Sequence, residues 1–237
     1  MKKTTLVFCL TMAFSSLTVV ASEKDIVTED STSTETPATA PKSSSYITGN
    51  IQFNDTKEFS GADQTATIEA GHFFDNGMVA YFELDAIDVA GFNDTQSNDA
   101  PFLTVGAEKR FYLDNGFWAG VGYQHLLKDA DTFQYRPLFW LGYNFDNGLT
   151  ITNRTRFQID GTGEGEDDVR LDNAIGYQFS NAPIFAKYSN LWLLDASKMD
   201  HEVRVTWTRN GFQPYVEYRN QFGNSNNVLA IGGTIAW

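Results

Sequence analysis

Basic side chains recur at alternate positions in the second half of the chain. Arg154 and Arg156 stand two residues apart in the segment LTITNRTRFQID. Residues two apart in an extended strand point to the same side, so both guanidinium groups would lie on one face. Guanidinium groups bind carboxylates and phosphates through paired hydrogen bonds. This spacing therefore predicts a face that holds or passes anions.

Further charges share this polar parity in the neighbouring segments. A dry core cannot hold so many ions, because each unpaired buried charge costs several kcal/mol, whereas a water-filled passage can. We expect a wet interior with eight basic pore-lining and substrate-binding residues and seven carboxylates among them. The basic residues are Arg110, Arg136, Arg154, Arg156, Arg170, Lys187, Arg204 and Arg219, and the acidic ones are Glu69, Glu83, Asp85, Glu108, Asp172, Glu202 and Glu217.

Two interpretations of Arg154 and Arg156 remain open at this point. In the first, the basic residues form a ladder that passes an anionic solute from one guanidinium to the next, as charged rings do in pores. In the second, the arginines pair across the barrel with Glu83, Glu108, Asp172 or Glu217 and stiffen the wall.

The elements that position these charges are short amphipathic strands. The segment from Thr132 to Asp160 is two such strands joined by Asp146-Asn147-Gly148, a turn type that supplies the positive φ of tight hairpins. Alternation continues from Tyr46 to the end of the chain. The predicted strands are 46–54, 65–74, 78–89, 102–112, 117–126, 132–145, 149–160, 168–179, 183–193, 201–209, 212–221 and 227–237.

The connections between these segments alternate between short and long. Short ones, such as the Asp-Asn-Gly turns at 75–77, 114–116 and 146–148, follow every second strand, and polar stretches of five to twelve residues follow the others. Transmembrane barrels have short periplasmic turns, longer outer loops and an even number of strands. The sequence therefore predicts a twelve-stranded antiparallel transmembrane β-barrel, closed by pairing its first and last strands.

Apolar residues of the opposite parity are predicted to face lipid. They include Ile151, Phe157 and Ile231, and the aromatic residues near strand ends would form girdles at the membrane interfaces. We place in these girdles Tyr46, Phe73, Tyr112, Phe117, Tyr143, Phe145, Tyr177, Phe179, Phe212 and Trp237.

Composition excludes several other classes of protein. The formal charge of −13 over 237 residues argues against binding of nucleic acid. Residues 1–21 read as a secretory signal peptide, with Lys2 and Lys3 before an apolar run and Ala21 at the cleavage site. The only cysteine, Cys9, lies within it, so the mature chain has no disulfide. The Ser-, Thr- and Glu-rich segment 22–45 reads as a disordered periplasmic tail, and 46–237 as the barrel.

The chain resembles the oligogalacturonate-specific porin family of small monomeric channels for acidic sugars. The resemblance is carried by the hairpins HFFDNGMVAYFEL and YNFDNGLTITNRTRF and by the strand from Gln213 to Tyr218, QPYVEY. It implies a twelve-stranded barrel with a narrow pore lined by arginine and lysine. On this resemblance, Arg136, Arg154, Arg156, Arg170, Lys187, Arg204 and Arg219 correspond to the basic lining.

We therefore expect a bacterial outer-membrane channel through which small hydrophilic solutes, above all anionic oligosaccharides or sugar acids, diffuse. The alternative is a non-conducting barrel with a structural, adhesion or receptor role through its outer loops. We expect no enzyme, cofactor or metal, although the acidic loop 161–168 leaves calcium binding open. Expected partners are outer-membrane lipid and lipopolysaccharide, and the barrel-assembly machinery at the strand ending in Trp237, with a monomeric state.

Overall fold

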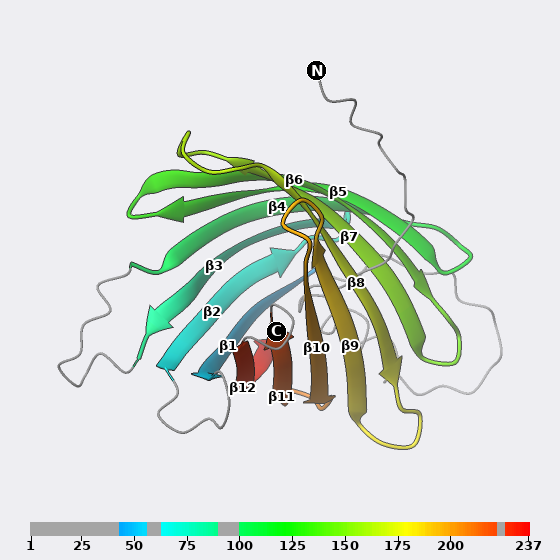
Figure 1. Cartoon of the computed structure of the whole chain (residues 1–237). Helices are drawn as coiled ribbons and strands as arrows, with labels where there is room; N and C mark the ends of the chain where they lie inside the picture. The colour runs from blue at the N-terminus through cyan, green and yellow to red at the C-terminus, as the bar shows by residue number, and fades with distance from the viewer. Residues whose placement is uncertain (1–42, 56–62, 90–99, 222–225) are drawn as a thin grey trace.

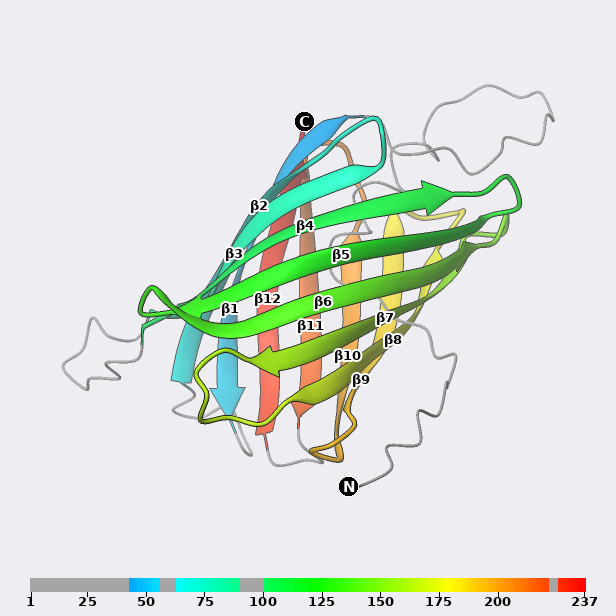
Figure 2. The same ribbon diagram turned by 90° about the horizontal axis from the view of Figure 1, so that it is seen from above.

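The computed structural model describes residues 43–55, 63–89, 100–221 and 226–237, which form a closed antiparallel barrel (Figures 1 and 2). Each strand pairs with its neighbours in the chain. Its strands are β1 (Ser44–Asp55), β2 (Asp63–Phe73), β3 (Met78–Asp88), β4 (Phe102–Tyr112), β5 (Phe117–Lys128), β6 (Asp131–Asn144), β7 (Leu149–Asp160), β8 (Asp168–Gln178), β9 (Ile184–Leu193), β10 (Lys198–Trp207), β11 (Phe212–Gln221) and β12 (Asn226–Ala236).

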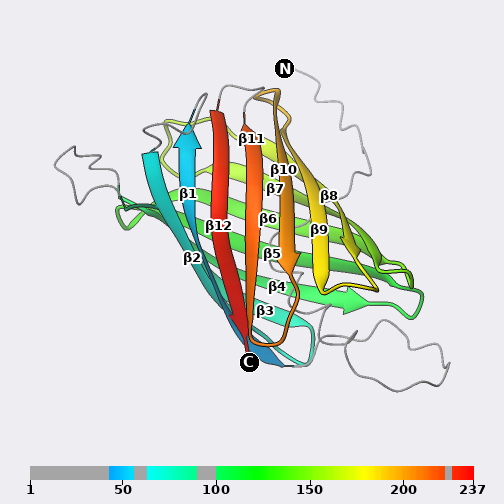
Figure 3. The same cartoon turned by 90° about the horizontal axis from the view of Figure 1, so that it is seen from below.

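The barrel closes where the two ends of the sheet meet. Strand β12 lies between β1 and β11 in Figure 3 and pairs with β1 from Tyr46 opposite Ala236 to Asp55 opposite Asn227. This pairing confirms the predicted closure and leaves neither strand with a free edge. Among the described residues there is no helix with the length and apolar character of a membrane span.

All twelve predicted strands are present, with ends shifted by at most three residues. At the N-terminal end of the barrel, Ser44 and Ser45 belong to β1 rather than to the predicted tail. The predicted signal peptide at 1–21, and the rest of the predicted tail up to residue 42, lie outside the described residues.

The three Asp-Asn-Gly turns have the same geometry. In the turn between β6 and β7, Gly148 has a φ of 85°, and the Asn147 side-chain oxygen accepts a 3.1 Å bond from the Leu149 N–H. Asn76 and Asn115 accept the corresponding bond in their own turns. The positive φ favours glycine because it lacks a Cβ, so the repeated motif fixes the short end of three hairpins.

The two faces of the sheet have the polarity that the sequence predicts. Ile231 is 52% exposed and Phe157 39% exposed on the outside, whereas Arg154 and Arg156 are 7% and 6% exposed. Apolar side chains therefore cover the outer surface and the charged ones point into the barrel. We call the inward-pointing side chains the inner wall.

Part of the barrel interior is packed with aromatic rings. Two groups of side chains, all nearly inaccessible to water, make up what we call the aromatic cluster: Tyr46, Phe73, Val79 and Tyr81 in one, and Trp118, Leu138 and Trp140 in the other. The prediction that Tyr46, Phe73 and Tyr112 belong to an outer girdle is therefore wrong, since Tyr112 packs against Trp118 inside the barrel. Their parity places them on the inner wall, where cross-strand neighbours leave room for large rings.

A glycine opposite an aromatic residue supplies this room. Trp118 pairs with Gly142, and a Cβ on Gly142 would come within 2.2 Å of the indole ring. Tyr46 and Tyr81 stand opposite Gly71 and Gly106 in the same way. Each ring thus lies over backbone rather than over a side chain, and the aromatic cluster fills the interior near the short turns.

Candidate functional site on the inner wall

All eight predicted basic residues lie on the inner wall. The strand register puts Arg154 between Trp140 on β6 and Asp172 on β8, and it puts Arg156 beside Arg170. Because side chains directly opposite each other in a sheet are close neighbours, these pairings set which charges meet.

Asp172 is the centre of one charged group. Its carboxylate is fully buried and accepts a 2.6 Å hydrogen bond from Arg154 Nε on one oxygen. Arg170 donates to the other oxygen and forms a second ion pair. One carboxylate therefore holds two guanidinium groups, and Arg154 is paired with a carboxylate named in the second interpretation, on the adjacent strand rather than across the barrel.

Glu217 on β11 is the centre of a second charged group. It accepts from Arg204 Nε at 2.5 Å and from Arg219 Nε at 2.6 Å. Arg219 also lies 3.5 Å from Glu202. These contacts link β10 to β11 on the inner wall. Each of the two arginines has an acidic partner.

Arg110 is enclosed by the aromatic cluster. It is 2% exposed, pairs with Glu108 at 3.0 Å, and its guanidinium carbon lies 5.5–5.7 Å from the ring centroids of Phe73, Trp118 and Trp140. Cation–π contacts of this kind gain strength when they are shielded from water. Arg110 is thus part of the packing between the aromatic rings.

Three basic residues have no carboxylate within ion-pair distance among the described residues. Arg136 donates to the side chain of Gln134 at 2.8 Å, and Arg156 donates to Gln124 at 3.0 Å. Lys187 stands opposite Arg204. Amide oxygens satisfy hydrogen bonds without neutralising charge, so Arg136 and Arg156 keep a positive charge that no ion pair in the described part of the chain offsets. Arg136 is partly exposed, whereas Arg156 and Lys187 are buried in the inner wall at 6% and 3% exposed.

Three carboxylates on β2 and β3 likewise form no ion pair within the described part of the chain: Glu69, Glu83 and Asp85. Asp85 accepts a 2.5 Å bond from the Thr67 hydroxyl. Thr67 in turn accepts from Gln52, which accepts a 3.3 Å bond from Arg219. On the described inner wall, the carboxylates without an ion pair thus lie on β2 and β3, and the basic residues without one lie on β6, β7 and β9.

A second hydrogen-bonded chain connects the basic side to the aromatic cluster. Gln124 accepts from Arg156 and donates to the Tyr81 hydroxyl at 2.6 Å. Tyr81 donates to Glu108 at 3.2 Å. Arg156 is therefore held in place by a neutral amide that is itself fixed, which keeps its guanidinium oriented.

A small recess in the inner wall brings the two signs of charge together. It has a volume of 220 Å³ and is lined by Glu83, Asp85, Thr104, Arg136 and the rings of Phe102 and Phe133, among others. The ring centroids of Phe102 and Phe133 are 5.2 Å apart. Hydrogen-bonding groups of both kinds beside aromatic faces suit a polar molecule such as a sugar better than a bare ion.

The acidic loop 161–168 and His72 make hydrogen bonds within the protein. In the acidic loop 161–168, Asp168 accepts from the Asp195 N–H at 2.9 Å, and Asp160 accepts from Gly163 N–H at 2.6 Å. Over the described ranges, no cluster of histidine, cysteine, aspartate or glutamate could hold a metal ion. His72 contacts the hydroxyls of Ser43 and Ser45, with no hydrogen bond to a carboxylate in the part of the chain described.

Sequence reasoning missed the aromatic cluster and the division of the arginines into paired and unpaired ones. Tyr81 shares its parity with Glu83 and Asp85, and Trp140 shares its parity with Arg136, and these shared parities were the available signal for the cluster. The ion pairs depend on the register between strands, and the alternation of residue types does not determine that register.

Comparison with known proteins identifies the fold. No protein-family model matches the sequence, and no curated protein sequence matches it. Among solved structures, the chain is similar to the KdgM porin, with a TM-score of 0.64 and 16% identity over 80% of this chain and 98% of that one. A structure of the KdgM porin in complex with disordered oligogalacturonate gives a TM-score of 0.64 at 17% identity, with the same coverage. The NanC porin gives 0.62 at 13% identity over 80% of this chain and 98% of that one. These likenesses confirm the predicted twelve-stranded porin fold.

Proposed function

We propose that the protein is an outer-membrane channel for passive diffusion of small hydrophilic solutes, with a preference for anionic oligosaccharides or sugar acids. The single observation that carries this proposal is the inner wall, where Arg136, Arg156 and Lys187 have no acidic partner in the described structure. Likeness to two porins, one of them solved with oligogalacturonate, supports it.

The mechanism is diffusion through a passage narrowed by side chains. A barrel of about 8 strands is filled and one of about 16–18 strands is wide open, so twelve strands give a restricted pore. The ion pairs at Asp172 and Glu217 fix the wall, and the unpaired guanidinium groups attract a carboxylate as it passes. Hydroxyl groups of the sugar can donate to Glu83 and Asp85 in the recess.

The membrane location and the partners belong to the same proposal. Large exposed apolar side chains cover the outside on all sides of the barrel, an arrangement that needs a lipid environment. We infer a monomer in the bacterial outer membrane, in contact with phospholipid and lipopolysaccharide. Recognition of the strand ending at Trp237 by the barrel-assembly machinery stays a prediction.

The decisive experiment is planar-bilayer recording of the purified full-length chain. Discrete current steps that are transiently blocked by oligogalacturonate, and less by a neutral oligosaccharide of equal length, would support the proposal. Steps with no block by the acidic sugar would refute the solute assignment and leave the channel intact.

One observation favours a second function. The aromatic cluster removes part of the interior from water, as expected if the barrel were non-conducting and acted through its outer loops as a structural, adhesion or receptor protein. Absence of current steps from protein that has inserted into the bilayer would establish this alternative.

A further inference from the structure

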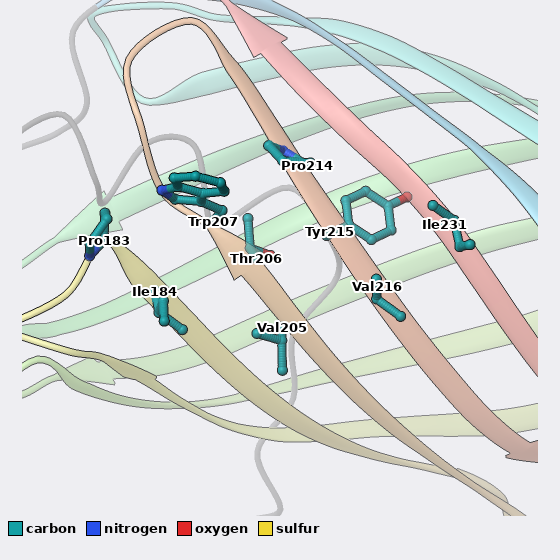
Figure 4. A pocket seen from close by; sticks show the side chains of 9 residues that line it. All are labelled: Pro183, Ile184, Val205, Thr206, Trp207, Pro214, Tyr215, Val216 and Ile231. Carbon is teal, nitrogen blue, oxygen red and sulfur yellow. The ribbon is translucent and has the colours of Figure 1, made fainter.

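An apolar groove opens on the outer face of the barrel at the short-turn ends of β9 to β12 (Figure 4). We call it the lateral groove. Its volume is 570 Å³, within the range of about 300–1,000 Å³ that small-molecule sites occupy. Its walls are formed by Ile184, Val205, Trp207, Pro214, Val216 and Ile231.

The groove exists because β10 and β11 separate before their turn. Their pairing ends with Thr206 opposite Tyr215. The next residue of β11 on that side, Pro214, has no N–H to donate to the ladder. The chain after β10 is held to the other neighbour instead, where the Thr208 N–H donates to the Pro183 carbonyl at 2.8 Å. Figure 4 shows Trp207 and Pro214 on opposite sides of the resulting gap.

The chemistry of the groove walls suits a hydrocarbon chain. Trp207, Val216 and Ile231 are each about half exposed on the outer face, and no charged residue lines the groove. An apolar hollow on a surface that faces lipid will hold part of a lipid molecule more closely than the convex wall around it, because more carbon contacts are made.

One basic residue, Arg209, lies at the end of the lateral groove, in the turn between β10 and β11. Arg209 is exposed, donates through Nε to the Phe212 carbonyl at 2.7 Å, and lies 5.2 Å from the Trp207 ring centroid. These contacts hold the guanidinium beside the groove while its terminal nitrogens remain free of ion pairs within the described structure. The three Asp-Asn-Gly turns on the same rim carry aspartate, with Lys109 donating to the Asn76 carbonyl in the first of them, whereas the turn that carries Arg209 has no acidic residue.

We propose that the lateral groove binds one acyl chain of a glycerophospholipid, whose phosphate contacts Arg209. The apolar walls account for the chain, and the guanidinium, oriented by Trp207, accounts for the headgroup. The proposal rests on the proposed membrane location and does not involve the lumen.

Native mass spectrometry of the full-length protein with phosphatidylglycerol tests the proposal. Arg209→Gln removes the cation and Val216→Trp fills the groove. Val121→Trp adds the same ring to an exposed outer position on β5, away from the groove, and serves as the matched control. We expect the most strongly retained lipid to decrease about tenfold in each of the first two variants and to stay unchanged in the control.

Equal retention of lipid in all four proteins would overturn the proposal. The same preparations, recorded in planar bilayers, separate this failure from failure of the channel assignment. Loss of lipid in the two groove variants supports the groove whether or not the wild type conducts.

Discussion

Replacement of both arginines that lack an acidic partner on β6 and β7 should change ion selectivity without unfolding the barrel. In Arg136→Gln/Arg156→Gln, the eight basic and seven acidic side chains predicted for the inner wall become six and seven, so the surplus changes sign. Arg156 stands opposite Arg170. Its removal therefore relieves like-charge repulsion rather than breaking an ion pair.

The size of the effect follows from Coulomb's law. An anion passing about 4 Å from a guanidinium gains about 1 kcal/mol even at the dielectric constant of bulk water. This is about a fivefold change in the ratio of anion to cation permeability for each arginine, since about 1.4 kcal/mol is tenfold. Two substitutions should therefore move the ratio by about 25-fold.

Reversal potentials under a potassium chloride gradient measure this ratio. We expect anion preference in the wild type and a shift toward cations in the double variant. Arg209→Gln removes the same charge from an exposed turn outside the lumen and should leave the potential unchanged. A double variant that folds, conducts and has the wild-type reversal potential would refute the assignment of Arg136 and Arg156 to the pore.

Three further predictions concern the wall itself. Asp172→Asn leaves Arg154 and Arg170 without their buried carboxylate and should cost about 3–5 kcal/mol of unfolding free energy, measured by urea titration in detergent; an unchanged midpoint would contradict the pairing. Val121→Arg places a charge on the lipid face, where the side chain is 56% exposed, and should cost about 2–4 kcal/mol in the same titration in liposomes, whereas a neutral effect would argue that this face is wet. Trp140→Ala empties part of the aromatic cluster and should cost about 3–5 kcal/mol while raising single-channel conductance; lower or equal conductance would show that the cluster does not narrow the passage.

The strands and their faces could be predicted because barrel sequences alternate with a strict period of two. Ile151 and Phe157 on one parity and Arg154 and Arg156 on the other leave one orientation that avoids charges in lipid. The Asp-Asn-Gly turns added the connectivity, because such sequences strongly favour tight hairpins. The residue pattern of each strand and turn is therefore enough to predict most of the architecture.

The aromatic cluster could not be predicted from the same pattern. An aromatic residue near a strand end suits a membrane interface as well as an interior, and only the residue across the strand pair decides between them. Tyr46 faces inward because Gly71 on β2 gives its ring room, and that pairing depends on register. For the same reason the sequence pattern could not predict that Arg154 stands opposite Asp172, whereas Arg156 stands opposite Arg170.

The central claim is that charged side chains surround a conducting aqueous passage, and a thiol probe tests it directly. Arg156→Cys places a thiol on the inner wall, and Ile231→Cys places one on the outer face, and the native Cys9 lies in the predicted signal peptide. During bilayer recording, a water-soluble anionic thiosulfonate should reduce the current through Arg156→Cys irreversibly and leave Ile231→Cys unaffected. Modification and block at Ile231→Cys, with an inert Arg156→Cys, would contradict the account.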